Sequence, residues 1–267
     1  MDMLLRYGLE FDPFTKNAKK TVFESTEYKE SLFRLNNLAK TKGFGVLTGS
    51  PGRGKTTVVR NWAYALNPSL YKVVYTCFST LTASDFYRHM VQQLGREAKF
   101  KKPDNFKEIR EEILRISVET RKTPVIIIDE ANYINNSILN DLKIIFNFDM
   151  DSRDHAVILL VGLPNLNGVL NQNIHEPLRQ RLVMNYNIEG MSKEEGRTYI
   201  EAKLRAASCR QTVFEPGAVE AILNTSDGSP RIIDKLCSKC LLTGNSKGAQ
   251  VITAEIVMDV INDCELG

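Results

Sequence analysis

The sequence lacks a hydrophobic run of the roughly 20 residues that a membrane-spanning helix needs. Its first residues also lack the basic start and sustained apolar run of a secretory signal peptide. A large charge of one sign is absent too, because 35 Lys and Arg face 32 Asp and Glu, so any basic surface must be local. These absences, in a chain of ordinary globular composition, lead us to expect a cytoplasmic protein.

Cysteine is scarce and odd in number, with five residues at positions 77, 209, 237, 240 and 264. Their scatter over expected strand, helix and tail favours free thiols in a reducing compartment over a disulfide framework. Cys237 and Cys240 form a C-x-x-C pair, but they lie inside an expected helix without a second pair or a histidine cluster. Packed thiols are therefore favoured over a zinc or redox site.

The order of apolar runs predicts a two-part fold behind an N-terminal segment. Apolar runs of strand type alternate with helical periodicity up to residue 190, and only helical patterns follow. This alternation requires right-handed crossovers, so we expect an α/β fold with a doubly wound parallel sheet. The expected parts are a linker and first helix over 1–40, an α/β domain over 41–190 and a small all-helical domain over 191–267. The expected strands are 45–48, 71–78, 124–129, 156–161 and 183–188.

One motif predicts a nucleotide site of the P-loop NTPase kind. The segment Gly49–Thr56 matches G-x-x-x-x-G-K-[ST] between an expected strand and an expected helix. Its glycines let backbone N–H groups turn toward a phosphate, and the helix N-terminus adds partial positive charge. We expect Lys55 to reach the β- and γ-phosphates of ATP and the Thr56 hydroxyl to ligate Mg²⁺. The predicted nucleotide contacts are Gly49, Ser50, Pro51, Gly52, Arg53, Gly54, Lys55, Thr56 and Thr57.

An acidic pair, Asp129 and Glu130, ends the most hydrophobic strand pattern, which begins at Pro124. Because ligands of open α/β sheets bind at the carboxyl ends of the strands, this pair is expected to face the phosphate loop. Asp129 is then a candidate for holding Mg²⁺, and Glu130 for orienting and polarising the attacking water. Solvated capping of a strand end is the alternative.

These motifs in this order make the chain resemble an AAA+ ATPase over almost its whole length. More narrowly, it is similar to the ExeA-like and TniB-like group, which includes target-selection ATPases of DNA transposition of the TnsC, TniB and Mu B type. The segments that carry the resemblance are Tyr7–Phe14, Gly49–Thr56, Ile127–Ala131, Gly162–Pro164, Leu178–Leu182 and Gly228–Arg231.

The resemblance implies roles for five further residues. Arg181, with Arg179 as second choice, would project into the neighbouring subunit's ATP as an arginine finger, although solvated surface is the alternative. Arg231 would sense the nucleotide, which makes the all-helical domain over 191–267 a lid for the nucleotide-binding domain over 41–190. Phe14 would stack near adenine, with core filling as the alternative. Because the fourth strand ends without a polar residue, Asn165 would take the water-positioning place, and slow hydrolysis is expected.

A short basic loop, Arg96–Lys102, has an aromatic residue inside it. A solvated loop is the alternative, but the resemblance favours backbone contacts to double-stranded DNA by Lys99, Lys101 and Lys102. The expected function is an ATP-dependent DNA-binding regulator of transposition, which forms a homo-oligomer on target DNA, recruits a transposase and disassembles on hydrolysis. The rival functions are an ExeA-type secretion ATPase and a replication-initiator or helicase-loader ATPase.

Overall fold

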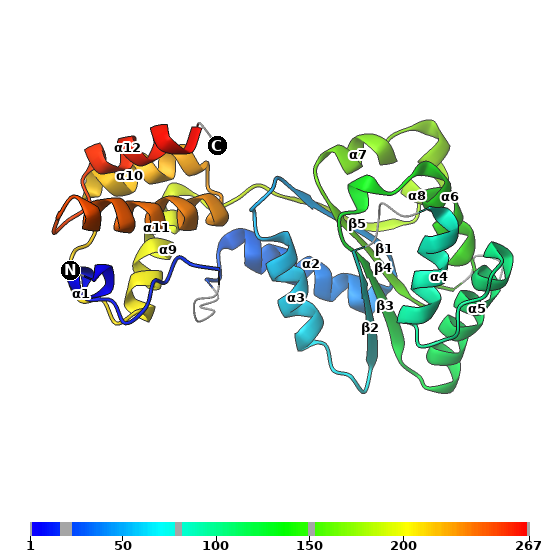
Figure 1. Ribbon diagram of the computed structural model, residues 1–267. Coiled ribbons are helices and arrows are strands. Elements are labelled where there is room, and N and C mark those ends of the chain that lie inside the picture. The colour runs from blue at the N-terminus through cyan, green and yellow to red at the C-terminus, as the bar shows by residue number, and fades with distance from the viewer. Residues whose placement is uncertain (1, 17–22, 78–81, 149–152, 266–267) are drawn as a thin grey trace. The chain divides into compact units, whose positions relative to one another are not determined.

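The computed structural model describes residues 2–16, 23–77, 82–148 and 153–265 (Figure 1). The chain divides into two compact units, each with its own hydrophobic core. Unit 1 consists of Met1–Lys29, Pro51–Gly54 and Glu189–Gly267, and unit 2 of Glu30–Ser50 and Lys55–Ile188. Four residues of the phosphate loop therefore group with unit 1, whereas the strand before the loop and the helix after it belong to unit 2.

Unit 2 is built on a parallel sheet in the strand order β2-β3-β4-β1-β5 (Figure 1). In register, Thr48 pairs with Gly162 and with Asn187, so the carboxyl ends of three strands meet at one edge. This is the edge where open α/β sheets bind ligands. The strands are β1 (Gly43–Gly49), β2 (Tyr71–Thr76), β3 (Thr123–Ile128), β4 (Val157–Gly162) and β5 (Leu182–Ile188).

Helices cover both faces of this sheet, α2 and α3 on one and α4, α5 and α6 on the other (Figure 1). Close packing on the first face explains Gly45, where an added Cβ would lie 2.3 Å from Leu38 Cδ2. Ile126 and Ile127 point to opposite faces and are both fully buried, as expected for strands covered on two sides. The doubly wound α/β fold is thereby confirmed. The segments are α2 (Thr26–Thr41), α3 (Lys55–Ala65), α4 (Ala83–Gln93), α5 (Lys102–Leu114), η1 (Arg115–Glu119), η2 (Ala131–Tyr133), α6 (Asn136–Ile145), α7 (Asn165–Leu170), η4 (Asn173–His175) and α8 (Glu176–Arg179).

Unit 1 is helical in its described residues. Proline opens both α10 and α11, where its fixed φ suits the first helical turn. A Ser192–Glu195 capping box opens α9. The helices are α1 (Met3–Tyr7), α9 (Lys193–Ala206), α10 (Pro216–Ser226), α11 (Pro230–Ser246) and α12 (Ala254–Glu265).

The N-terminal segment is part of the core of unit 1, whereas the sequence had suggested a linker. Tyr7 is fully buried, and its hydroxyl donates to the Ala249 carbonyl at 3.2 Å. Asp12 accepts from the Ser238 hydroxyl at 2.6 Å and from the Phe14 N–H at 2.9 Å. The aromatic residues of this segment fold onto helices some 200 residues later in the chain, a partner that local patterning does not reveal.

Candidate nucleotide site and basic loop

The phosphate loop depends on glycine for its backbone. Gly52 and Gly54 have φ values of +79° and +95°, a region that residues with a side chain rarely adopt. A Cβ added to Gly54 would meet no atom within 4 Å, so open space lies beside the loop there. The Lys55 ammonium donates to the carbonyls of Gly49 at 2.7 Å and Ser50 at 3.1 Å. An open, glycine-shaped turn at a helix N-terminus with a lysine beside it fits a triphosphate.

Asp129 and Thr56 are brought together within unit 2, as the sequence predicted. Asp129 is 5% exposed, and its Oδ2 accepts from the Thr56 hydroxyl at 3.3 Å and from the Tyr75 hydroxyl at 2.9 Å. Its Oδ1 accepts from the Glu130 N–H at 2.9 Å. A hydroxyl beside a carboxylate is an oxygen donor set of the type Mg²⁺ prefers, so these residues fit the expected metal. Burial, followed by the hydrogen bond to Asp129, raises the pKa of Tyr75 above its ordinary value.

Glu130 is the second residue after β3 and is exposed in a left-handed backbone conformation, with φ +55°. This conformation turns the chain into η2. Asn132 in η2 then accepts from the Leu163 N–H at 3.0 Å, which ties the turn to the end of β4. Its Nδ2 is buried and has no hydrogen-bond partner in the described part of the chain.

The structure corrects the expectation for Asn165. Asn165 is exposed at the first position of α7, while Asn167 turns inward and its Nδ2 donates to the Thr48 hydroxyl at 3.1 Å. Thr48 in turn donates to Asn187 Oδ1 at 3.0 Å. Two helical positions differ by about 200° around the axis, so only one of these asparagines can face the sheet. The sequence analysis did not locate the start of α7 at residue 165, and that start determines which asparagine faces the sheet.

Arg181 and Arg179 both hold backbone carbonyls at helix C-terminal ends. Arg181 donates to the Lys143 carbonyl in the last turn of α6 at 3.0 Å, and Arg179 to the Asn171 carbonyl after α7 at 3.0 Å. Cations at helix C-termini interact favourably with the last carbonyls. Within one chain, therefore, both arginines have local contacts, and their predicted role toward a second subunit stays a prediction.

Within unit 1, the loop residues 51–54 pack against the turn that precedes α11. A Cβ on Gly52 would lie 2.7 Å from Ser229 Oγ and 2.8 Å from Arg231 Cβ, so only glycine fits there. Arg53, one of the predicted nucleotide contacts, forms an ion pair with Asp227 at 2.5 Å. Arg231 itself is exposed near the start of α11.

The structure also corrects the adenine contact expected of Phe14. Phe14 is 3% exposed and packs edge-on against Phe214, with ring centroids 6.3 Å apart. The Lys203 ammonium lies 6.0 Å from the Phe14 centroid and donates to the Pro13 carbonyl at 3.0 Å. With its ring inside the core of the helical unit, Phe14 has no open face for a base. Core filling, the alternative that the sequence left open, describes it.

The basic loop is held in a fixed shape by a fully buried asparagine. Asn105 accepts from the Lys99 N–H at 2.7 Å and donates to the carbonyls of Lys99 at 2.9 Å and Lys101 at 3.3 Å. Lys99 and Lys101 are exposed, and Phe100 between them is 85% exposed. The Arg88 guanidinium lies 5.9 Å from the Phe100 centroid. Two cations and an aromatic ring are therefore presented to solvent on a pre-shaped loop.

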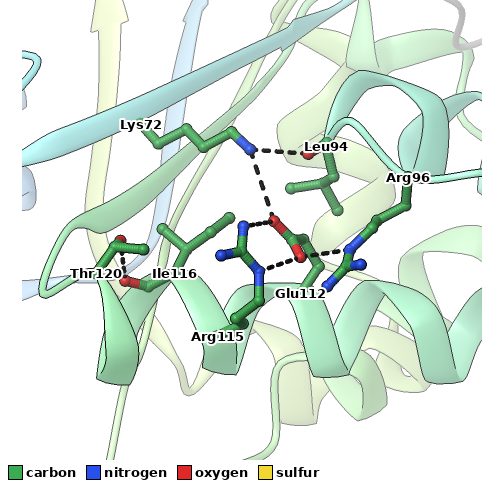
Figure 2. Close-up of polar contacts among 7 residues, drawn as sticks. All are labelled: Lys72, Leu94, Arg96, Glu112, Arg115, Ile116 and Thr120. Carbon is green, nitrogen blue, oxygen red and sulfur yellow. Dashed lines mark hydrogen bonds and ion pairs between the residues drawn. The ribbon is translucent and has the colours of Figure 1, made fainter.

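The start of this loop is anchored through Arg96. Figure 2 shows Arg96, Arg115 and Lys72 converging on the buried Glu112 carboxylate, with distances of 2.6, 2.6 and 3.7 Å. Lys72 also donates to the Leu94 carbonyl at 2.8 Å. Hydrogen bonds from Arg115 and Arg96 lower the pKa of Glu112 to about 2, against the opposing effect of burial.

Lys102 does not share the exposure of its neighbours, which corrects its predicted contact with DNA. Its ammonium pairs with Asp141 of α6 and lies 5.3 Å from the Tyr87 centroid. Because α5 begins at Lys102, this side chain turns onto neighbouring helices. Its charge is already balanced.

The C-x-x-C pair and a buried histidine have structural roles. Cys237 and Cys240 are buried and unbridged, and burial raises the pKa of Cys237. His175 is buried between Asn140 and Asn136, at 3.1 and 3.0 Å. The described residues contain no group of three His, Cys, Asp or Glu placed to hold a metal ion. Within the same ranges, we find no helix with the length and apolarity that crossing a bilayer requires.

Comparison with known proteins agrees with this geometry. General secretion pathway protein A of Aeromonas hydrophila is 29% identical over 252 residues, which are 92% of this chain but 45% of that protein. The chain thus spans less than half of its curated relative. Among solved structures, the fold resembles Cdc6p of Pyrobaculum aerophilum, with a TM-score of 0.66, 13% identity and coverage of 90% and 67% of the two chains. It also resembles the RuvB branch migration motor of Thermotoga maritima, with a TM-score of 0.58, 20% identity and coverage of 88% and 67%.

A family model described as "AAA domain" matches residues 37–170. That range is half of the chain and contains both the phosphate loop and the acidic pair that follows β3. The chain therefore belongs to the AAA domain family and is an ATPase that works with ATP and Mg²⁺.

Proposed function

We propose that this ATPase is a DNA-binding regulator of DNA transposition. It assembles with ATP on double-stranded DNA as a homo-oligomer, recruits a transposase and disassembles on hydrolysis. The observation that carries the proposal is the pre-shaped loop that exposes Lys99, Phe100 and Lys101. The resemblance of the motifs to transposition ATPases supports the transposition role. Two solved proteins of similar fold, ORC1 of Aeropyrum pernix and Drosophila ORC, are described as bound to DNA.

For hydrolysis, we assign the chemistry to four residues of unit 2. Lys55 binds the β- and γ-phosphates, while Thr56 and Asp129 hold Mg²⁺, which neutralises charge that develops on the phosphates. Glu130 orients and polarises the attacking water, and its exposure after β3 leaves its carboxylate accessible. The backbone of Gly49–Gly54 surrounds the phosphates.

Arginines complete the proposed site. Arg181, or Arg179 in its place, reaches the ATP of a neighbouring subunit and offsets charge in the transition state. Arg231 is the proposed sensor of the nucleotide, as the resemblance of the motifs implies. In a homo-oligomer each nucleotide then lies between two copies, so ATP binding favours assembly and hydrolysis favours disassembly.

Lys99 and Lys101 are the proposed DNA contacts, with Arg88 and Phe100 beside them. Lysines neutralise phosphates and release counterions, which supplies affinity without base recognition. A loop fixed by Asn105 loses little conformational freedom on binding. One copy offers few cations, but repetition around an oligomer multiplies them. The expected binding is strong, dependent on salt and non-specific in sequence.

The test is duplex DNA binding with a non-hydrolysable ATP analogue at several salt concentrations. Alanine at both Lys99 and Lys101 is expected to weaken binding about 10-fold or more and to lower the salt slope by roughly 1 to 2 per bound subunit. The control is Lys107→Ala, an exposed lysine paired with Glu111 on the same helix. Absence of ATP-dependent duplex binding by the unaltered protein would contradict the proposal.

The Aeromonas relative favours a second candidate, a secretion-type ATPase in which the same cassette energises envelope assembly. The two candidates differ in their response to duplex DNA. ATPase activity that rises with added duplex supports the transposition role. Activity indifferent to DNA in the unaltered protein and in the Lys99 and Lys101 variant alike supports the secretion role.

A further inference from the structure

We propose that Tyr75 is a positioning residue for the magnesium site. It lies one residue before the end of β2, and its hydroxyl donates to Asp129 Oδ2 at 2.9 Å. The same oxygen accepts from the Thr56 hydroxyl at 3.3 Å. The inference rests on the proposed magnesium roles of Thr56 and Asp129, and it adds a third residue that no motif of the sequence identifies.

The register of the sheet explains how Tyr75 reaches this carboxylate. Tyr75 pairs with Ile127 on β3, so Asp129 is its diagonal neighbour on the same face of the sheet. The long tyrosine side chain spans this offset, and its hydroxyl reaches the carboxylate. Phenylalanine here would keep the ring and lose the hydrogen bond.

The hydrogen bond fixes the carboxylate in one orientation. Asp129 Oδ1 is held by the Glu130 N–H at 2.9 Å, and Oδ2 by Tyr75 and Thr56. If the Thr56 oxygen ligates a metal, the Thr56 hydroxyl can still donate its hydrogen bond to Asp129. The hydrogen bond from Tyr75 then keeps the carboxylate from rotating. Donors behind a metal-holding group typically change metal affinity or activity by about 10- to 100-fold when removed.

The test is a Mg²⁺ titration of Tyr75→Phe, followed by binding of a fluorescent non-hydrolysable ATP analogue. We expect the Mg²⁺ concentration for half-maximal binding to rise about 10-fold, with analogue affinity in EDTA unchanged. ATPase activity should show the same increased Mg²⁺ requirement and little change in maximal rate at saturating Mg²⁺. The control is Tyr71→Phe, which removes a tyrosine hydroxyl from the other end of the same strand and should leave the titration unchanged.

A wild-type Mg²⁺ requirement in Tyr75→Phe would overturn the inference, as would an equal loss of analogue affinity with and without Mg²⁺. Asp129→Asn separates this failure from failure of the proposed site. If Asp129→Asn raises the Mg²⁺ requirement and Tyr75→Phe does not, only the role of Tyr75 is lost. If neither variant changes it, the magnesium roles themselves are wrong. When both act, the double variant should show less than the product of the single effects, because the two residues share one contact.

Discussion

Glu130 combines an exposed carboxylate with an unfavourable backbone conformation. A φ of +55° in a residue with a side chain costs about 1 kcal/mol or more, and such strain gathers at functional sites. The conformation makes the chain leave the sheet directly after Asp129, so the two carboxylates diverge. Asp129 is buried among donors, whereas Glu130 stays in solvent. Two adjacent acids thereby have separate environments, which suits the separate tasks proposed for them.

Glu130→Gln keeps the shape of the side chain and removes its capacity as a base. We expect nucleotide affinity close to that of the unaltered protein and hydrolysis lowered by about 10²-fold or more. Calorimetry with ATP and a phosphate-release assay measure the two quantities. Glu130→Gly serves as a control for the backbone, because it should also lose hydrolysis while unfolding at an equal or higher temperature. Full turnover in Glu130→Gln would remove the assigned role.

At the scale of elements, the Glu112 cluster joins α5, η1, β2 and the residues after α4 (Figure 2). Its carboxylate is buried and held by cations, so its folded-state pKa of about 2 lies below the ordinary value of 4.5. A lowered pKa means that the folded state favours the ionised form. The resulting stability is complete above pH 4.5 and is lost as the pH falls toward 2.

Glu112→Gln is expected to lower the free energy of unfolding at pH 7 by about 2 to 3 kcal/mol. The difference from the unaltered protein should shrink progressively below pH 4.5. Urea unfolding at pH 7 and near pH 3.5 measures both values. Glu111→Gln, at an exposed neighbour, should change stability by less than about 0.5 kcal/mol at either pH. A difference that does not depend on pH would show that the charge of Glu112 is unimportant.

The sequence predicted the strands well because buried parallel strands are continuous apolar runs, as at 124–129. Helix starts were less accurate. The basic loop was expected to include Lys102, but α5 begins at that residue, since Pro103 is compatible with the first turn. That shift turned Lys102 toward Asp141 and changed its predicted role.

Site residues within a motif were predictable, because the phosphate loop and the end of β3 carry local signals. Tyr75 and Asn167 were missed, since their roles depend on register across strands and on the face of a short helix. Phe14 was predicted to stack near adenine, yet it packs against Phe214, which lies far along the chain. Contacts of this kind require the tertiary structure.

At the scale of the whole molecule, one chain supplies a phosphate loop and an acidic pair, while its proposed finger arginine donates to a carbonyl of the same chain. Arg181 donates to Lys143 and Arg179 to Asn171. A trans role for either arginine requires a second copy. It also predicts that a subunit lacking its finger still hydrolyses ATP when an intact neighbour supplies one.

Mixing two inactive variants tests this requirement directly. Arg181→Ala alone should reduce hydrolysis about 10²-fold and leave nucleotide affinity of the monomer nearly unchanged. Added Glu130→Gln subunits carry an intact arginine, so mixed oligomers should regain a measurable part of the wild-type rate at the Arg181→Ala sites. Arg179→Ala, tested in the same mixture, decides between the two candidates, because only the finger variant is complemented. If neither mixture regains activity, the arginines act within their own chain, as their contacts with Lys143 and Asn171 would then indicate.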